Sequence, residues 1–314
     1  MSSLLSRLLS NKTEHLQVAV IAFSLYTHPG FSSFKFLILA STFIIYLRIL
    51  FRQSPSQVKK AVNMYDEFFL LGDSITQQGY SSGWVSLLSD AYIRRLRIIN
   101  NGLSGYNTSQ ALRVLPKILS PYSSSSSPKI RIATLFFGAN DARLPETGAQ
   151  HIPIQEFKEN LKKIVTTLEK HAPKIILMTP PPINMRMADA GNAERGIMET
   201  HRTAPVTASY AQAVRDVGKE LDLPVLDVWS AFMSRTGWKE GDSGPLPGSK
   251  ENDEPVLPTL LSDGLHLTPK GNQIVYEELL ELIAKKWPDQ IPEKIESPLP
   301  MWDEPAENWS KYGV

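Results

Sequence analysis

From Glu67 onward, the chain alternates short apolar runs with longer segments that have a helical period. This alternation is typical of repeated βα units, whose strands lie parallel in one sheet and whose helices cover it. The sequence therefore predicts an α/β fold with a parallel five-stranded sheet. The expected strands are 68–72, 96–100, 130–138, 174–179 and 224–228, and the expected helices are 84–95, 108–118, 154–171, 206–221 and 269–286.

Charge is distributed unevenly along the chain. The whole sequence has 33 Lys and Arg against 32 Asp and Glu, a net charge of +1. Residues 1–64 are strongly basic, however, because Glu14 is their only acidic residue, and the remainder is mildly acidic. A nearly neutral chain lacks the concentrated positive charge that phosphate neutralisation needs, so we expect no nucleic-acid partner. The absence of cysteine excludes disulfides, thiolate metal sites and cysteine nucleophiles.

Residues 1–64 form a basic, apolar leader with two interpretations. In the first, residues 31–51 are a membrane anchor, since they reach the required length of about 20 residues if Lys35 and Arg48 extend toward the interfaces. Basic residues after this stretch would keep the following domain on the cytoplasmic side. In the second, the leader is an extension outside the domain, and the protein is cytoplasmic without this membrane contact. The sequence leaves the choice, and the oligomeric state, open.

The rest of the chain divides into a domain and a tail. Residues 65–286 contain all the expected strands and helices and form a single predicted domain. Residues 287–314 are rich in proline, which excludes one continuous helix, and we expect this tail to pack on the domain surface. Within the domain, residues 186–201 have no clear periodicity. We interpret them as a surface insertion, with a substrate lid as the alternative.

Polar clusters occur where the expected strands end. Ser74 comes directly after the first strand, Gly105 follows the second, and Asn140 follows the third. Asp263 and His266 come after the fifth strand, beyond a long loop. Because ligands of open parallel sheets bind at the carboxyl ends of the strands, we expect these residues to lie near one another.

Together these residues supply the parts that acyl transfer to a serine requires. The hydroxyl of Ser74 needs a base, and His266 can serve if Asp263, three residues away, orients its ring. The developing oxyanion needs hydrogen-bond donors, which the backbone N–H groups of Ser74 and Gly105 and the Asn140 amide can provide. The sequence therefore predicts Ser74, Asp263 and His266 as catalytic residues, and Ser74, Gly105 and Asn140 as an oxyanion hole.

Several nearby residues have structural interpretations. Ser81 stands in a literal G-x-S-x-G motif, but polar residues precede it where a nucleophile elbow requires a buried strand. Asp73 and Asp141 are expected to hold turns through backbone hydrogen bonds. The histidines other than His266, among them His201, lack the spacing of metal ligands, and we expect surface or packing roles for them.

Four motifs in this order resemble the SGNH hydrolase superfamily, also called GDSL esterases and lipases. They are 71–77 (LGDSITQ), 105–108 (GYNT), 137–141 (FGAND) and 262–266 (SDGLH), and they resemble most the isoamyl-acetate-hydrolysing esterase type. The resemblance covers about residues 65–285. It implies a flavodoxin-like, three-layer α/β/α domain that hydrolyses small acyl esters with water, without metal or cofactor. Asn101 stands where that subset would have a basic residue, so the resemblance leaves the detailed substrate preference open.

Other functions remain compatible with the sequence. The same three catalytic residues could serve an acyltransferase or a lysophospholipase, because the acceptor pocket decides between these reactions. A non-catalytic, membrane-associated binding protein is an alternative from another class. A flavodoxin-like nucleotide or flavin binder is a third, although the sequence lacks a loop that would cradle phosphate.

Overall fold

In the computed structural model, which describes residues 64–124 and 127–313, five parallel strands form one sheet. The strand order is β2-β1-β3-β4-β5, as in a doubly wound sheet. All four neighbouring pairs are parallel, which confirms the predicted sheet. The strands are β1 (Asp66–Gly72), β2 (Leu96–Gly102), β3 (Ile130–Phe136), β4 (Ile175–Met178) and β5 (Val225–Leu226).

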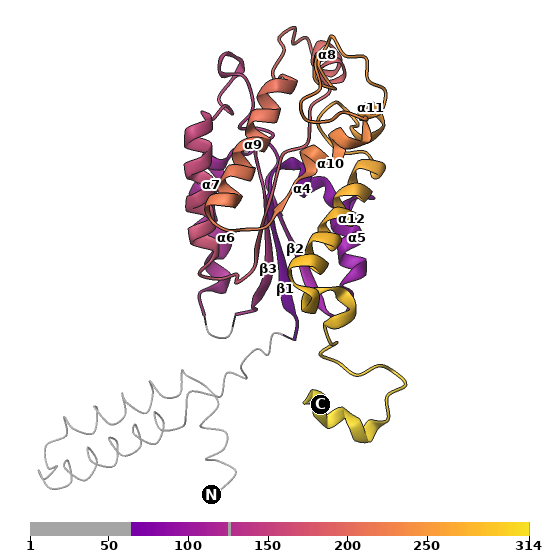
Figure 1. The fold of residues 1–314 in the computed structure, drawn as a ribbon. Coiled ribbons are helices and arrows are strands. Elements are labelled where there is room, and N and C mark those ends of the chain that lie inside the picture. The colour runs from indigo at the N-terminus through magenta and orange to yellow at the C-terminus, as the bar shows by residue number, and fades with distance from the viewer. Residues whose placement is uncertain (1–63, 125–126, 314) are drawn as a thin grey trace, which may run out of the picture. The chain divides into compact units, whose positions relative to one another are not determined.

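Helices cover both faces of the sheet, as Figure 1 shows. Successive side chains of a strand point to opposite faces, so β1 contributes to two cores. Phe68 and Leu70 pack with α5, α10 and α12, whereas Phe69 and Leu71 pack with α6, α7 and α9. The three-layer α/β/α architecture is therefore confirmed. These helices are α5 (Trp84–Ala91), α6 (Thr108–Leu119), α7 (Ile154–Leu168), α9 (Ala204–Glu220), α10 (Val228–Arg235) and α12 (Pro269–Lys286).

The five predicted helices are present, but some of their ends differ from the prediction. The first was expected to reach residue 95 but ends at Ala91, because Arg94 has a φ of +61° that no α-helix accommodates. The shorter helices α4, α8, α10 and α11 were not predicted. Of these, α4 spans Ser74–Gln77, α8 spans Met185–Ala193 and α11 spans Leu257–Leu260. The 3₁₀ helices are η1 (Gln78–Tyr80), η2 (Ser120–Tyr122), η3 (Pro145–Thr147), η4 (Pro288–Gln290), η5 (Pro292–Lys294) and η6 (Ala306–Tyr312).

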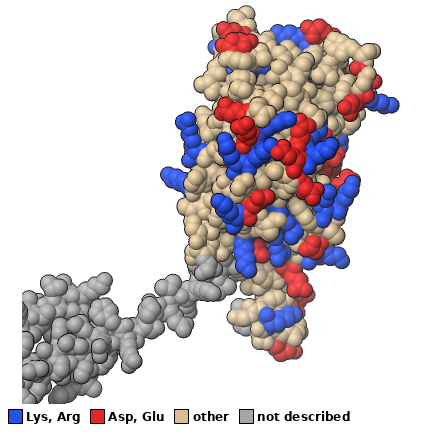
Figure 2. All heavy atoms as spheres, turned by 60° about the vertical axis from the view of Figure 1, so that its left-hand side comes forward, with Lys and Arg blue, Asp and Glu red and all other residues tan. Residues whose placement is uncertain are grey.

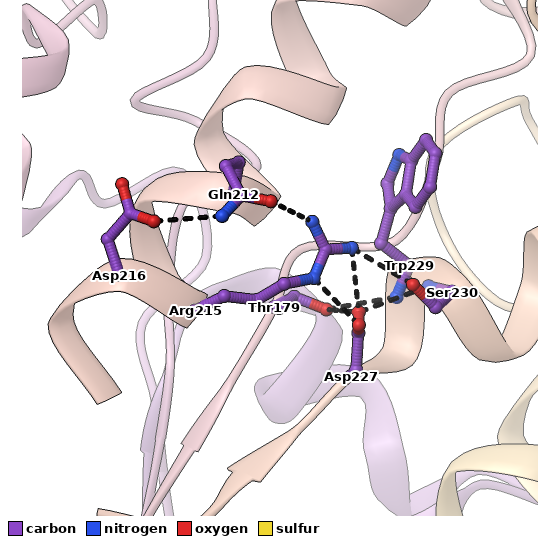
Figure 3. A network of polar contacts seen from close by, with 7 residues as sticks. All are labelled: Thr179, Gln212, Arg215, Asp216, Asp227, Trp229 and Ser230. Carbon is purple, nitrogen blue, oxygen red and sulfur yellow. Dashed lines mark hydrogen bonds and ion pairs between the residues drawn. The ribbon is translucent and has the colours of Figure 1, made fainter. Parts of the chain in front are cut away.

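A polar network joins α9 to the ends of β4 and β5 (Figure 3). The Arg215 guanidinium donates to both carboxylate oxygens of Asp227, at 2.7 and 3.1 Å, and lies over the Trp229 ring. Asp227 also accepts from the backbone N–H of Ser230 and so begins α10. The Thr179 hydroxyl donates to Asp227 and accepts from the Trp229 N–H. The network therefore ties three segments together at the edge of the sheet.

We expect Arg215→Met to lower the free energy of unfolding by about 1–3 kcal/mol at pH 7, because it leaves the half-buried Asp227 without its cation. Burial opposes ionisation of Asp227, but the hydrogen bonds from Arg215 and Ser230 outweigh it and hold the pKa below its ordinary value. The stabilisation is thus present above the unfolded-state pKa of about 3.9 and is lost as pH falls through the lower folded-state pKa. Urea unfolding at pH 7 and pH 3 measures both effects.

The matched control for this prediction is Arg186→Met. Arg186 pairs with Asp253 at the surface, where the two side chains are 50% and 90% exposed, so its loss should cost under about 0.5 kcal/mol. Equal losses in the two variants, or a difference between them that persists undiminished at pH 3, would contradict the expectation.

The proline-rich tail has two parts. In the first, the Tyr92 hydroxyl donates to the Gln290 carbonyl, Ile295 is buried in the core that contains α5 and α12, and Arg94 donates to the Pro300 carbonyl. This part packs on the domain. In the second part Trp302 is 87% exposed, and hydrogen bonds run from the residues of η6 to Glu304 within the tail itself.

Lys, Arg, Asp and Glu are interspersed on the face that Figure 2 shows, without a region of one sign. Ion pairs between α7 and α9, Lys158 with Asp216 and Lys162 with Glu220, illustrate this alternation. Residues 31–51, for which a membrane anchor is one of the two interpretations, lie outside the described residues. Within residues 64–124 and 127–313, no helix is long and apolar enough to cross a membrane.

Candidate active site

Ser74 is the first residue of α4 and stands directly after β1. The Asp73 carboxylate accepts a hydrogen bond from the Ile75 N–H at 2.9 Å and begins the helix, which confirms the structural role expected of Asp73. Burial, slightly offset by that hydrogen bond, raises the pKa of Asp73 to about 7. This turn places Ser74, which is 5% exposed, at the carboxyl end of β1, an inner strand between β2 and β3.

Asp263 and His266 lie in one tight loop before α12. The Ser262 N–H donates to the His266 carbonyl at 2.7 Å, which closes the loop. Gly264 between them has a φ of +87°, and a Cβ there would come within 2.4 Å of the Asn184 carbonyl oxygen. Only glycine fits this position, because it alone tolerates both the left-handed backbone and the close approach. The loop thus presents both side chains on one side.

The loop brings His266 into hydrogen-bond contact with both Asp263 and Ser74. Nδ1 of His266 lies 2.7 Å from Oδ2 of Asp263, and its Nε2 lies 2.9 Å from Oγ of Ser74. The other oxygen of Asp263 accepts from the backbone N–H groups of Leu265 and His266. Burial opposes ionisation of Asp263, but these hydrogen bonds prevail and hold its pKa well below the usual range. Asp263 is therefore a carboxylate at neutral pH.

Gly105 and Asn140 line the same cavity as Ser74 and His266. Gly105 has a φ of +81°, a conformation that favours glycine. Neither its N–H nor that of Ser74 donates a hydrogen bond within the described part of the chain. The structure therefore brings together all five residues singled out from the sequence.

The side chain of Asn140 is held in one orientation by its neighbours. Its Nδ2 donates to the Tyr106 carbonyl at 2.9 Å, and its Oδ1 accepts from Arg202 and Gln150 at 3.2 and 3.3 Å. The second hydrogen of Nδ2 has no acceptor in this network and is free to bind a ligand. Gln150 also donates to the carbonyl of Gly105, so it connects the two loops.

The cavity has a volume of about 360 Å³. Helix α8 and the residues after it line one side, among them Ala188, Gly191, Asn192, Arg195 and Ile197. The interpretation of residues 186–201 as a surface insertion is therefore wrong in this respect, because a part of the segment forms a wall of the cavity. The remaining lining residues are Ser74, Ser104, Gly105, Asn140, Arg143, Gln150, Ile183, His201, Arg202, Asp263, Leu265 and His266.

Sequence reasoning missed four polar residues of this cavity. Arg143, Gln150 and Arg202 were not singled out as site residues, and His201 was assigned a surface or packing role. His201 is buried and faces Arg143, with 3.2 Å between its Nε2 and the guanidinium. Isolated arginines and glutamines in loops carry no local pattern, so only the folded structure reveals them.

Asp141 links two of the loops. Its Oδ1 accepts from the backbone N–H and the hydroxyl of Thr108, at 2.9 and 2.5 Å, and so joins the loop after β3 to the start of α6. Burial raises its pKa to about 6 against these hydrogen bonds. Asp141 therefore does more than stabilise its own turn, because it also connects the loop after β3 to the start of α6. Within residues 64–124 and 127–313, no cluster of three or more His, Asp or Glu side chains is placed to hold a metal ion.

Comparison with known proteins identifies the family of the chain. Residues 70–274 match the GDSL-like lipase/acylhydrolase family. A GDSL esterase/lipase of Arabidopsis thaliana is 38% identical over 240 residues, which cover 73% of this chain and 90% of the relative. An isoamyl acetate-hydrolyzing esterase 1 homolog of Bos taurus is 35% identical over 231 residues, 71% of this chain and 83% of the relative.

Solved structures show the same fold. A catalytic mutant of an acetylxylan esterase from Geobacillus stearothermophilus superposes with a TM-score of 0.51 at 18% identity, covering 71% of this chain and 95% of that one. At this identity the likeness concerns the fold alone. The family match and the curated relatives carry the assignment: the chain belongs to the GDSL-like lipase/acylhydrolase family and is an esterase of the SGNH type.

Proposed function

We propose that this esterase hydrolyses small carboxylic esters through an acyl-enzyme on Ser74. Oγ of Ser74 attacks the ester carbonyl carbon, and Nε2 of His266 takes the hydroxyl proton. The tetrahedral intermediate then breaks its bond to the alcohol oxygen, and His266 returns the proton to the leaving alcohol. Water attacks the acyl-enzyme by the same route, giving the carboxylic acid and free Ser74.

The contacts of His266 are the single observation that carries this proposal. Its two ring nitrogens contact Ser74 and Asp263 at 2.9 and 2.7 Å, which is within hydrogen-bond distance on both sides. Asp263 accepts the Nδ1 proton, so Nε2 is left as the base that faces the hydroxyl. The same carboxylate stabilises the imidazolium that forms when the proton is transferred.

The negative charge on the carbonyl oxygen needs donors that are free before substrate binds. The N–H groups of Ser74 and Gly105 and one hydrogen of the Asn140 amide meet this requirement. Donors that are already in place stabilise the intermediate without reorganisation. We therefore assign these three groups as the oxyanion hole, with Arg202 and Gln150 as residues that position Asn140.

Labelling with a fluorophosphonate probe tests the proposal directly. We expect one covalent adduct, which mass spectrometry of the digested protein assigns to Ser74. An adduct on another serine, or no adduct under conditions in which esters are hydrolysed, would rule out the proposed nucleophile.

Asn140→Ala is expected to lower kcat about 10²-fold to 10³-fold for a short-chain nitrophenyl ester, because a donor to the oxyanion is lost. KM should change little, since the donor acts mainly on the transition state. Asn160→Ala provides a matched control, because Asn160 is a buried asparagine of α7 that bonds to Thr108 and Ser109 instead. A loss of less than tenfold in kcat for Asn140→Ala would remove its side chain from the oxyanion hole.

A further inference from the structure

Positive charge is concentrated in the cavity beside Ser74. Three arginines line it, Arg143, Arg195 and Arg202, whereas Asp263 is its only acidic lining residue. The carboxylate of Asp263 is committed to His266 and to the loop backbone. The cavity therefore presents more positive charge than its own wall neutralises.

Arg143 is held in place by neutral groups alone. Its guanidinium donates to the Thr147 hydroxyl and to the side-chain Oε1 of Gln150, both at 3.1 Å, and lies 3.2 Å from Nε2 of His201. Burial, and then the charges of Arg143 and Arg202, lower the pKa of His201, so its ring is neutral at pH 7 and can accept this hydrogen bond. No carboxylate in the described part of the chain pairs with Arg143.

Arg202 is in a similar position. It donates to the Ala139 carbonyl at 2.6 Å and to Oδ1 of Asn140, and forms no ion pair with any described residue. Burial, and then the charge of Arg143, lower its pKa to about 10. The charges of Asp73 and Asp263 act in the opposite direction but offset this lowering only in part. Arg143 and Arg202 are thus two like charges that line the same cavity, and their repulsion costs energy unless a negative charge compensates it.

Arg195 follows α8, lines the same cavity and is more exposed than Arg143 and Arg202. Its guanidinium forms no hydrogen bond or ion pair within the described residues, so it is free to bind a ligand. Arg186 and Arg215, by contrast, are paired with acidic residues, Asp253 and Asp227 respectively. The three arginines of the cavity thus have no carboxylate partner among the described residues, at the place where a substrate must enter.

We propose that this cavity binds an anionic group of the ester substrate, a carboxylate or a phosphate, through Arg143 and Arg195. The anion compensates the positive charge that the wall leaves unpaired, and guanidinium groups bind such oxyanions with paired hydrogen bonds. This inference rests on the proposed hydrolysis at Ser74 and specifies its substrate class. The anion can belong to the acyl or the alcohol part, depending on which of them occupies the cavity.

Two pairs of esters test the proposal, each pair matched in shape and different in charge. The acyl pair is 4-nitrophenyl hydrogen glutarate against the neutral 4-nitrophenyl glutaramate. The alcohol pair is 4-acetoxybenzoate against 4-acetoxybenzamide, and every rate is divided by that of uncatalysed hydrolysis. For one of the pairs we expect kcat/KM to be about tenfold higher with the anionic ester. The pair that shows the preference identifies the part of the substrate in the cavity.

Substitutions then assign the preference to the arginines. Arg195→Gln is expected to lower the anionic preference several-fold, and Arg195→Glu to abolish it. Arg186→Gln on α8 is the matched control, because the Arg186 guanidinium binds Asp253 and the Lys250 carbonyl and does not line the cavity. Arg186→Gln should leave the preference for anionic over neutral esters at the wild-type value.

The outcomes distinguish the two proposals. If no ester is hydrolysed, or if hydrolysis persists in Ser74→Ala, the proposed function fails. If both neutral and anionic esters are hydrolysed through Ser74 at equal rates, only the anionic substrate class is wrong. An anionic preference that survives in both Arg195→Gln and Arg143→Gln would likewise overturn the assigned binding residues.

Discussion

Replacing Ser74 with alanine is expected to lower kcat for short-chain nitrophenyl esters by about 10⁴-fold or more. The variant lacks the oxygen that attacks the carbonyl, so no acyl-enzyme forms. Residual hydrolysis would come from binding and the oxyanion donors alone. The measurement is steady-state hydrolysis with enzyme in excess of any contaminating esterase, supported by a fluorophosphonate titration of active sites.

Ser81→Ala is the matched control for this substitution. Ser81 is exposed and follows the short helix η1 instead of a strand, although it stands in the G-x-S-x-G motif. We expect it to keep wild-type kcat. If Ser74→Ala remained within tenfold of wild type, or if Ser81→Ala lost activity to the same extent, the assignment of Ser74 would be wrong.

Asp263→Asn is expected to lower kcat by about 10³-fold. The amide cannot accept the Nδ1 proton of His266 as the carboxylate does, so the ring can adopt the tautomer that has no base facing Ser74. A fully buried triad loses about 10⁴-fold on this change, and the smaller value reflects the 45% exposure of the Asp263 side chain, where water screens its charge.

A loss of kcat in the Asp263→Asn variant can be assigned to catalysis only if the variant remains folded. Asp263 also accepts two backbone hydrogen bonds within its loop, and asparagine can retain these. The variant should therefore unfold at a similar temperature and still bind substrate with little change in KM. A kcat within tenfold of wild type would show that Asp263 does not orient His266, and a large fall in Tm would show a structural role instead.

The strands and major helices were predictable because their patterns are local. Phe68 to Leu71 is a continuous apolar run, as a strand buried on both faces requires, and the structure places its alternate side chains in two cores. Thr268 before Pro269 predicted where the last helix begins, and the Thr268 hydroxyl does accept from the Gly271 N–H. The ends of helices were less predictable, as Arg94 shows, because a single left-handed residue ends a helix without a strong sequence signal.

The residues around the site also differ in how well the sequence predicted them. Ser74, Gly105, Asn140, Asp263 and His266 were identifiable because each lies in a short motif directly after a strand or before a helix, and parallel strands bring their carboxyl ends to one edge. Helix α8 was not, since residues 186–201 show no period that would indicate which side faces the domain.

By itself, the sequence determined the α/β architecture, and it predicted the edge of the sheet at which the proposed catalytic residues lie and which residues these are. Those properties depend on periodicity, turn residues and motif order, all of which are written along a few consecutive positions. Only the tertiary structure decided that His266 contacts both Ser74 and Asp263, that Arg202 and Gln150 orient Asn140, and that three arginines without a carboxylate partner among the described residues line the cavity. Such contacts join residues far apart in the chain, and whether an arginine is paired depends on every neighbour that folding brings within reach.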